Sequence, residues 1–203
     1  MKLLAYLGII CLILGSFYGI NHLGTSYTSQ HPTLNETATD PDLYLRNVAY
    51  YSKEQTPDRC LYHLDKAITS IKYIESDMDV NTSNKVDEAL TKLEMIYQEI
   101  AHNALSKEDL SEAFQYTLNT LALAELRVSE RYAEGNHMDL SMIALKYAQL
   151  HIKNALQYTG QKNLKFEQEM FLQVDSILNN QTEPSVLVAE HIDELIREMS
   201  EKL

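Results

Sequence analysis

Apolar side chains recur every three or four positions through most of the chain after residue 57, and this spacing limits the fold more than any other feature. Because an α-helix has about 3.6 residues per turn, such a spacing places apolar side chains on one face of a helix. Six consecutive stretches of this kind cover about residues 57–78, 84–105, 106–134, 139–159, 163–178 and 184–201. The sequence therefore predicts an all-α fold of about six helices, either an antiparallel helical bundle or stacked helical hairpins.

Residues that commonly begin or end helices lie at the borders of these stretches. Asp40–Asp42 combines an N-cap, a proline in the first turn and an early acid, which predicts a short helix over residues 40–53. Ser106–Asp109 resembles a capping box, and Gly135 and Gly160 suit the left-handed position after a helix. We therefore expect one helical domain, residues 40–203, with the short helix followed by hairpins at 57–105, 106–160 and 163–202.

The N-terminus contains an apolar run that is long enough to cross a membrane. Leu3–Ile20 carries no charge, and as a helix it would rise roughly 27 Å, near the thickness of the hydrocarbon layer. Lys2 precedes it and favours a cytoplasmic N-terminus. We expect residues 1–24 to be a transmembrane or signal-anchor helix and the polar residues 25–39 to be a flexible tether. The helical domain would then be periplasmic or extracellular.

Two other interpretations of the leader place the domain on the same side of the membrane. A cleaved signal peptide would make the protein secreted, but the small residues Gly15, Ser16 and Gly19 do not form a clear cleavage signal. A lipoprotein signal ending at Cys11 would need a small residue where Ile10 stands. A single-pass anchor is the preferred interpretation.

The charge of the chain restricts its partners. Lys and Arg number 17 against 29 Asp and Glu, which gives a formal net charge of −12. Such a chain does not attract nucleic acid or an anionic lipid surface, and a basic partner would suit it better. The sequence contains no familiar nucleotide-binding, haem-binding or nucleophile motif, so we expect no cofactor, and an enzyme ranks third behind an interaction module and a ligand-binding bundle.

Two ionisable residues fall on apolar helix faces and are the main candidates for a binding site. Helical-wheel positions place Glu125 and His151 on the faces of the third and fourth long helices, where Tyr147 also lies. A buried carboxylate is costly unless it is paired, so the sequence predicts a contact between Glu125 and His151. This pair would either specify packing, the commoner role, or bind a small ligand.

A weaker alternative is a metal site near one end of the first hairpin. Folding that hairpin brings Cys60 and His63 to the end that carries Glu99 and His102, and these residue types suit zinc. The wheel positions of His63 and His102 lie away from the centre of the apolar faces, which favours surface histidines instead.

The leading functional hypothesis is a membrane-tethered module outside the cytoplasm that acts by protein interaction, as an accessory or sensory protein. The alternative is a helical bundle that binds a small ligand or metal. Tyr44, Tyr50 and Tyr51 make the short helix amphipathic, so this helix either caps the bundle or contacts a partner. The partner is a protein of unidentified type or, as a further alternative, a second copy of the chain.

Overall fold

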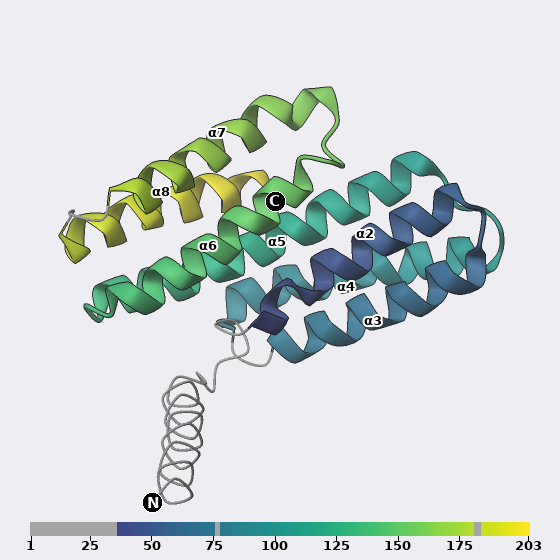
Figure 1. Cartoon of the computed structure of the whole chain (residues 1–203), viewed down its shortest axis with the longest axis horizontal. Helices are drawn as coiled ribbons and strands as arrows, with labels where there is room; N and C mark the ends of the chain where they lie inside the picture. Colours follow the sequence, from purple (N-terminus) through teal and green to yellow (C-terminus); the bar gives the residue numbers. More distant parts are fainter. Residues whose placement is uncertain (1–35, 76–77, 181–183) are drawn as a thin grey trace, which may run out of the picture. The chain divides into compact units, whose positions relative to one another are not determined.

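The computed structural model describes residues 36–75, 78–180 and 184–203. Within these ranges the chain forms a short 3₁₀ helix and seven α-helices, with no strand, which confirms the expected all-α class (Figure 1). The elements are η2 (Glu36–Thr39), α2 (Asp40–Lys53), α3 (Pro57–Glu75), α4 (Val80–Ala101), α5 (Lys107–Glu134), α6 (Met138–Ala155), α7 (Gln161–Asn179) and α8 (Ser185–Lys202).

The helix α5 organises the domain because it contributes to two separate apolar cores. Its 28 residues span about 42 Å at 1.5 Å per residue. The first half of α5, with Phe114 fully buried, packs with α2, α3 and α4. The second half, with Leu126 fully buried, packs with α6, α7 and α8. The two groups of helices therefore share one long element, as Figure 1 shows.

The centre of α5 is covered on all sides. Every residue from Thr117 to Leu126 is buried, so this stretch has no solvent-facing stripe. Polar side chains here must find partners inside the protein, because an unpaired buried polar group is costly. Thr117 does so within its own helix, where its hydroxyl donates to the carbonyl of Ala113 at 2.8 Å. Asn119 and Glu125 extend between helices and take part in the sites described below.

Several helix boundaries differ from those predicted, and capping explains one of them. The second long helix was predicted to begin at about residue 84, but the Asp79 side chain accepts hydrogen bonds from the backbone N–H groups of Asn81 and Thr82. Asp79 is thus an N-cap, and α4 begins at Val80.

The prediction that Gly135 and Gly160 adopt the left-handed conformation was wrong. Gly135 has φ −75° and Gly160 has φ −71°, so neither adopts the left-handed conformation. After α5 that role falls to Asn136, at φ 58°, and asparagine is among the few residues that tolerate it. The expected cap at Ser106 is present, since its Oγ accepts the N–H of Asp109 at 3.0 Å.

The predicted anchor, residues 1–24, and most of the predicted tether lie outside the described residues. Residues 36–39, which the sequence pattern assigned to the tether, form η2, and Ala38 is fully buried. In the part of the chain that the structure does describe, no helix combines the length and apolar character needed to cross a membrane.

Candidate functional site

A buried polar cluster lies where α2, α5 and α6 meet, and Asp42 is at its centre. The Asp42 Oδ1 atom accepts a hydrogen bond from Asn154 Nδ2 at 2.7 Å. Its Oδ2 atom lies 2.7 Å from His151 Nδ1, a close contact that does not meet the geometry of a hydrogen bond. Both side chains of this contact are almost completely buried. The cluster therefore holds α2 against α6, although Asp42 and Asn154 are 112 residues apart in the sequence.

In the described part of the chain, Glu125 and His151 do not form the hydrogen bond or ion pair that was predicted between them. His151 pairs with Asp42 instead, and its Nε2 atom has no hydrogen-bond partner. Glu125 is buried with its Oε2 atom also unpartnered. Burial, and secondarily the charge of Asp42, raise the pKa of Glu125 well above its ordinary value. Burial therefore favours the protonated form of Glu125, close to the contact between Asp42 and His151.

A small pocket of about 200 Å³ opens beside this cluster. Its lining includes Asp42, Asn154 and Arg46, but not Glu125, His151 or Tyr147. The residues predicted as ligand contacts therefore do not line this pocket. Glu125 and His151 are instead buried close to Asp42, which indicates a role in packing.

The four residues of the predicted metal site lie in separate environments. Cys60 is buried, and its Sγ donates to the Val48 carbonyl at 3.7 Å. His102 is exposed and its Nδ1 lies 2.7 Å from the carbonyl of Gln98. Across the described ranges, no three His, Cys, Asp or Glu side chains form a group that could hold a metal ion, so His63 and Glu99 do not complete one either.

His63 instead belongs to a row of aromatic rings on the outer surface of α2 and α3. Its ring stacks on Tyr51 with centroids 5.3 Å apart and an interplanar angle of 9°. Tyr62 meets His63 edge-on at 5.2 Å, and Tyr50 meets Tyr51 edge-on at 5.2 Å. Tyr50 and Tyr62 are 57% and 59% exposed. We call Tyr50, Tyr51, Tyr62 and His63 the aromatic face.

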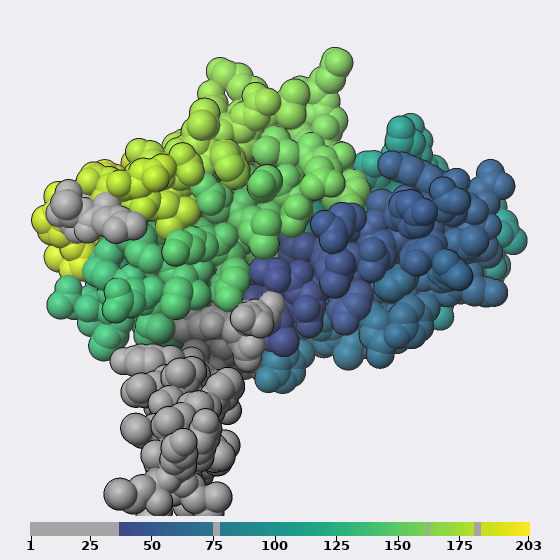
Figure 2. All heavy atoms as spheres, in the orientation of Figure 1, coloured from purple at the N-terminus to yellow at the C-terminus, as the bar shows by residue number. Residues whose placement is uncertain are grey.

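Two cations cover rings of the aromatic face. The guanidinium of Arg59 lies 5.1 Å from the Tyr51 centroid, and the ammonium of Lys66 lies 5.7 Å from that of Tyr62. Burial, and then the charge of Arg59, lower the pKa of His63. His63 is therefore neutral at pH 7 and stacks as an uncharged ring. Figure 2 shows α2 and α3 side by side on one surface of the domain.

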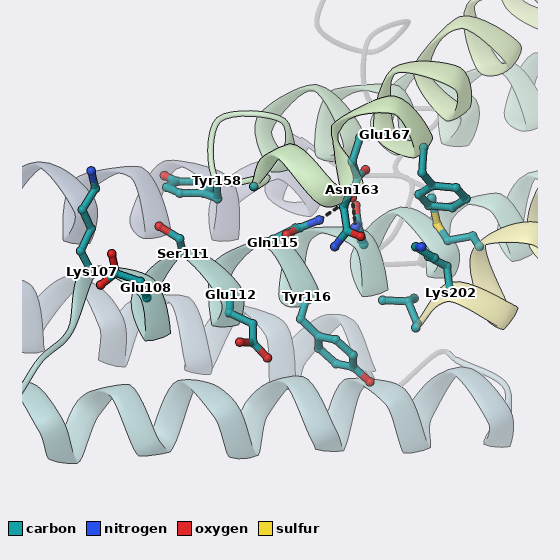
Figure 3. A pocket seen from close by; sticks show the side chains of 15 residues that line it. Lys107, Glu108, Ser111, Glu112, Gln115, Tyr116, Tyr158, Asn163, Glu167 and Lys202 are labelled. Carbon is teal, nitrogen blue, oxygen red and sulfur yellow. Dashed lines mark hydrogen bonds between the residues drawn. The ribbon is translucent and has the colours of Figure 1, made fainter.

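A larger groove of about 500 Å³ runs between the first half of α5, the first half of α7 and the end of α8 (Figure 3). Glu167 of α7 lines it and is fully buried. Its Oε1 atom accepts hydrogen bonds from Gln115 Nε2, at 2.9 Å, and from Asn119 Nδ2. The Oε2 atom of Glu167 and the Oδ1 atom of Asn119 have no partner. Glu167 was not among the site residues predicted from the sequence.

Comparison with known protein families, with characterised proteins and with solved structures finds no match to the chain. Its function is therefore inferred from the geometry of these three regions: the buried cluster, the aromatic face and the groove.

Proposed function

We propose that the chain is a membrane-tethered protein-interaction module and that the aromatic face of α2 and α3 is its docking surface. Residues 1–24 would anchor it, with the helical domain outside the cytoplasm. The observation that carries the proposal is the continuous row of four rings, two of them more than half exposed, with Arg59 and Lys66 placed over them.

The composition of the aromatic face is that of a protein contact. Tyrosine and arginine are enriched among the interface residues whose truncation most weakens binding. A tyrosine ring buries much apolar area while its hydroxyl keeps a hydrogen bond, and it loses little side-chain entropy. Tyr51 and His63 are already held by their stack, so Tyr50 and Tyr62 are partly ordered before a partner arrives. This ordering lowers the entropic cost of docking.

The aromatic face also differs in charge from the chain as a whole. The full chain has a net charge of −12, yet the side chains resting on the rings are Arg59 and Lys66. The negative net charge of the whole chain was expected to favour a basic partner. On the aromatic face itself, the complementary surface is apolar with carboxylates at its rim, because these would meet the two cations.

The alternative hypothesis, a ligand site between α5 and α6, has less support. Glu125 and His151 are buried, and the pocket beside them is lined by neither. Their contacts are accounted for by the packing of α2 against α6 through Asp42. A buried polar cluster of this kind more often specifies packing than binds a ligand.

Site-specific photo-crosslinking in intact cells tests the proposed docking surface. A photoreactive amino acid replaces Tyr62 in one full-length variant and Leu172, on α7, in another. The two positions are matched, since both lie on helices and their side chains are 59% and 63% exposed. We expect a covalent adduct of one defined mass from position 62 and none of that mass from position 172.

Two further results decide the interpretation. Adding Arg59→Ala to the position-62 variant should reduce the adduct yield, because the cation at the rim is removed. An adduct whose mass is twice that of the chain would identify the partner as a second copy. Equal adducts from both positions, or none from position 62, would contradict the aromatic face as a docking surface.

A further inference from the structure

We propose that the groove between α5, α7 and the end of α8 binds a small organic cation, a primary ammonium or guanidinium compound, through Glu167 and Asn119. This site is separate from the aromatic face, and neither proposal depends on the other.

The floor of the groove presents hydrogen-bond acceptors without matching donors. Both amide groups that reach Glu167, those of Gln115 and Asn119, donate to the same oxygen, Oε1. Glu167 Oε2 and Asn119 Oδ1 are left buried and unpartnered. Leaving such buried atoms without a hydrogen bond destabilises the folded protein. A ligand carrying N–H groups would satisfy both, and an ammonium or guanidinium carries several.

The negative charge of the Glu167 carboxylate at the floor of the groove favours a cationic ligand over a neutral hydrogen-bond donor. Glu167 is fully buried, and a buried carboxylate is stabilised most by a positive partner. Burial raises its pKa, while the two amide hydrogen bonds and the charge of Lys202 lower it in part. An anion would be repelled by this carboxylate. The hydroxyls of a neutral polyol could also donate to these acceptors, but they would leave the charge of the Glu167 carboxylate uncompensated.

Among the described residues, Lys202 is the cation whose charge lowers the pKa of Glu167, and its ammonium does not occupy the floor of the groove. Its ammonium lies over the Phe166 ring, 5.5 Å from the centroid, and it acts on Glu167 through space. Lys202 is exposed at the end of α8, so it can move aside without disturbing the core. Phe166 and Tyr158 also line the groove and offer ring faces to a second cation.

The size of the groove sets the size of the ligand. A volume of about 500 Å³ lies within the range of small-molecule sites, roughly 300–1,000 Å³. Figure 3 shows Gln115 reaching toward Glu167 from α5, with Tyr158 toward one end of the groove and Lys202 toward the other. An aliphatic diamine or an aminoalkyl guanidine fits these dimensions, with one charged end at Glu167.

Calorimetric titration of the full-length protein in a polyoxyethylene detergent tests the proposal. The probes are agmatine, which has a guanidinium and an ammonium, and putrescine, with glucose and inorganic phosphate as comparison ligands. We expect saturable binding of one or both amines and none of glucose or phosphate. Glu167→Gln should weaken amine binding at least tenfold, because it removes the charge and keeps the side-chain shape. The matched control is Glu190→Gln, which makes the same charge change at an exposed position of α8 and should bind as the wild type does.

A second variant keeps the test valid if Glu167→Gln fails to fold. Lys202→Glu changes an exposed side chain and should tighten amine binding at least threefold, because it removes the resident cation and adds a negative charge. No saturable binding of either amine would overturn the proposal. Amine binding that neither Glu167→Gln nor Lys202→Glu changes would also overturn it, as would preferential binding of phosphate or glucose.

Discussion

Replacing Glu125 by glutamine is expected to stabilise the helical domain and to flatten its dependence on pH. Glu125 is buried in the centre of α5 with one carboxyl oxygen unpartnered. Burial, together with the charge of Asp42, raises its pKa in the folded state. In the unfolded chain the same carboxyl ionises at an ordinary pKa of about 4.3. Folding must therefore hold a proton on Glu125, and this cost grows as the pH rises.

The magnitude follows from proton linkage. Below the ordinary pKa both states are protonated and Glu125 contributes no pH dependence. Between the ordinary and the raised pKa only the folded state binds the proton, so the free energy of unfolding falls by about 1.4 kcal/mol for each pH unit. The window therefore opens at the ordinary pKa and extends upward to the raised pKa of Glu125. Within it the wild type should lose stability relative to Glu125→Gln as the pH rises, by up to about 1.4 kcal/mol for each pH unit.

Urea unfolding of residues 31–203, followed by circular dichroism at pH 5, 6 and 7, measures this difference. Glu190→Gln is the control, since Glu190 is exposed on α8 and the net charge changes equally. Its pH dependence should match that of the wild type. The reasoning would be refuted if Glu125→Gln followed the wild type at all three pH values. A variant less stable than the wild type at pH 7 would show that the folded protein stabilises the ionised carboxylate.

Four further changes test other parts of the structure. Phe114→Ala removes a fully buried ring from the first core and should lower the free energy of unfolding by about 3–5 kcal/mol, measured in urea. Ser106→Ala removes the N-cap of α5 and should cost about 1 kcal/mol in the same assay. His151→Leu leaves the Oδ2 atom of Asp42 buried without its close neighbour and should lower the free energy of unfolding by about 1–3 kcal/mol, part of which Asp42→Asn restores. If the domain lies outside the cytoplasm, Leu172→Cys should react with a membrane-impermeant maleimide in intact cells. The native Cys60 is buried and should not react. Labelling of Leu172→Cys only after cell lysis would contradict that placement.

The helices could be predicted from the sequence because their signal is local. An apolar stripe of period 3.6 is a property of consecutive residues, so it survives without knowledge of the tertiary fold. Boundaries were less secure. Residues 79–83 carry turn-forming types, but the same types cap helices, and only the backbone geometry at Asp79 decides between these roles.

The buried polar contacts could be predicted only in part. Glu125 and His151 were recognised as buried because they interrupt apolar stripes. The prediction that His151 contacts Glu125 was wrong, because its neighbour Asp42 lies on α2. How α2 packs against α6 depends on long-range contacts. A signal for Asp42 was nevertheless present, since it lies three residues before the buried Leu45 on the same face.

Glu167 had the same kind of signal. It precedes Met170, Val174 and Ile177 at spacings of three, four and three residues, and all four are buried. An acid on the apolar stripe of α7 could therefore have been identified by the reasoning that found Glu125. Its two amide partners could not, because Gln115 and Asn119 lie on α5 about fifty residues away. Only the part of the aromatic face on α2 could be predicted from the sequence, because its other two rings lie on α3.

The most direct test of a docking role for α2 and α3 is the dissociation constant of the partner captured at position 62. It is measured by biolayer interferometry against full-length wild type, Tyr62→Ala and Leu172→Ala. Truncating a central interface tyrosine typically costs 2 kcal/mol or more, so Tyr62→Ala should weaken binding roughly thirtyfold, while Leu172→Ala should leave it unchanged. Equal affinities for wild type and Tyr62→Ala, or a loss caused by Leu172→Ala alone, would show that the partner binds elsewhere.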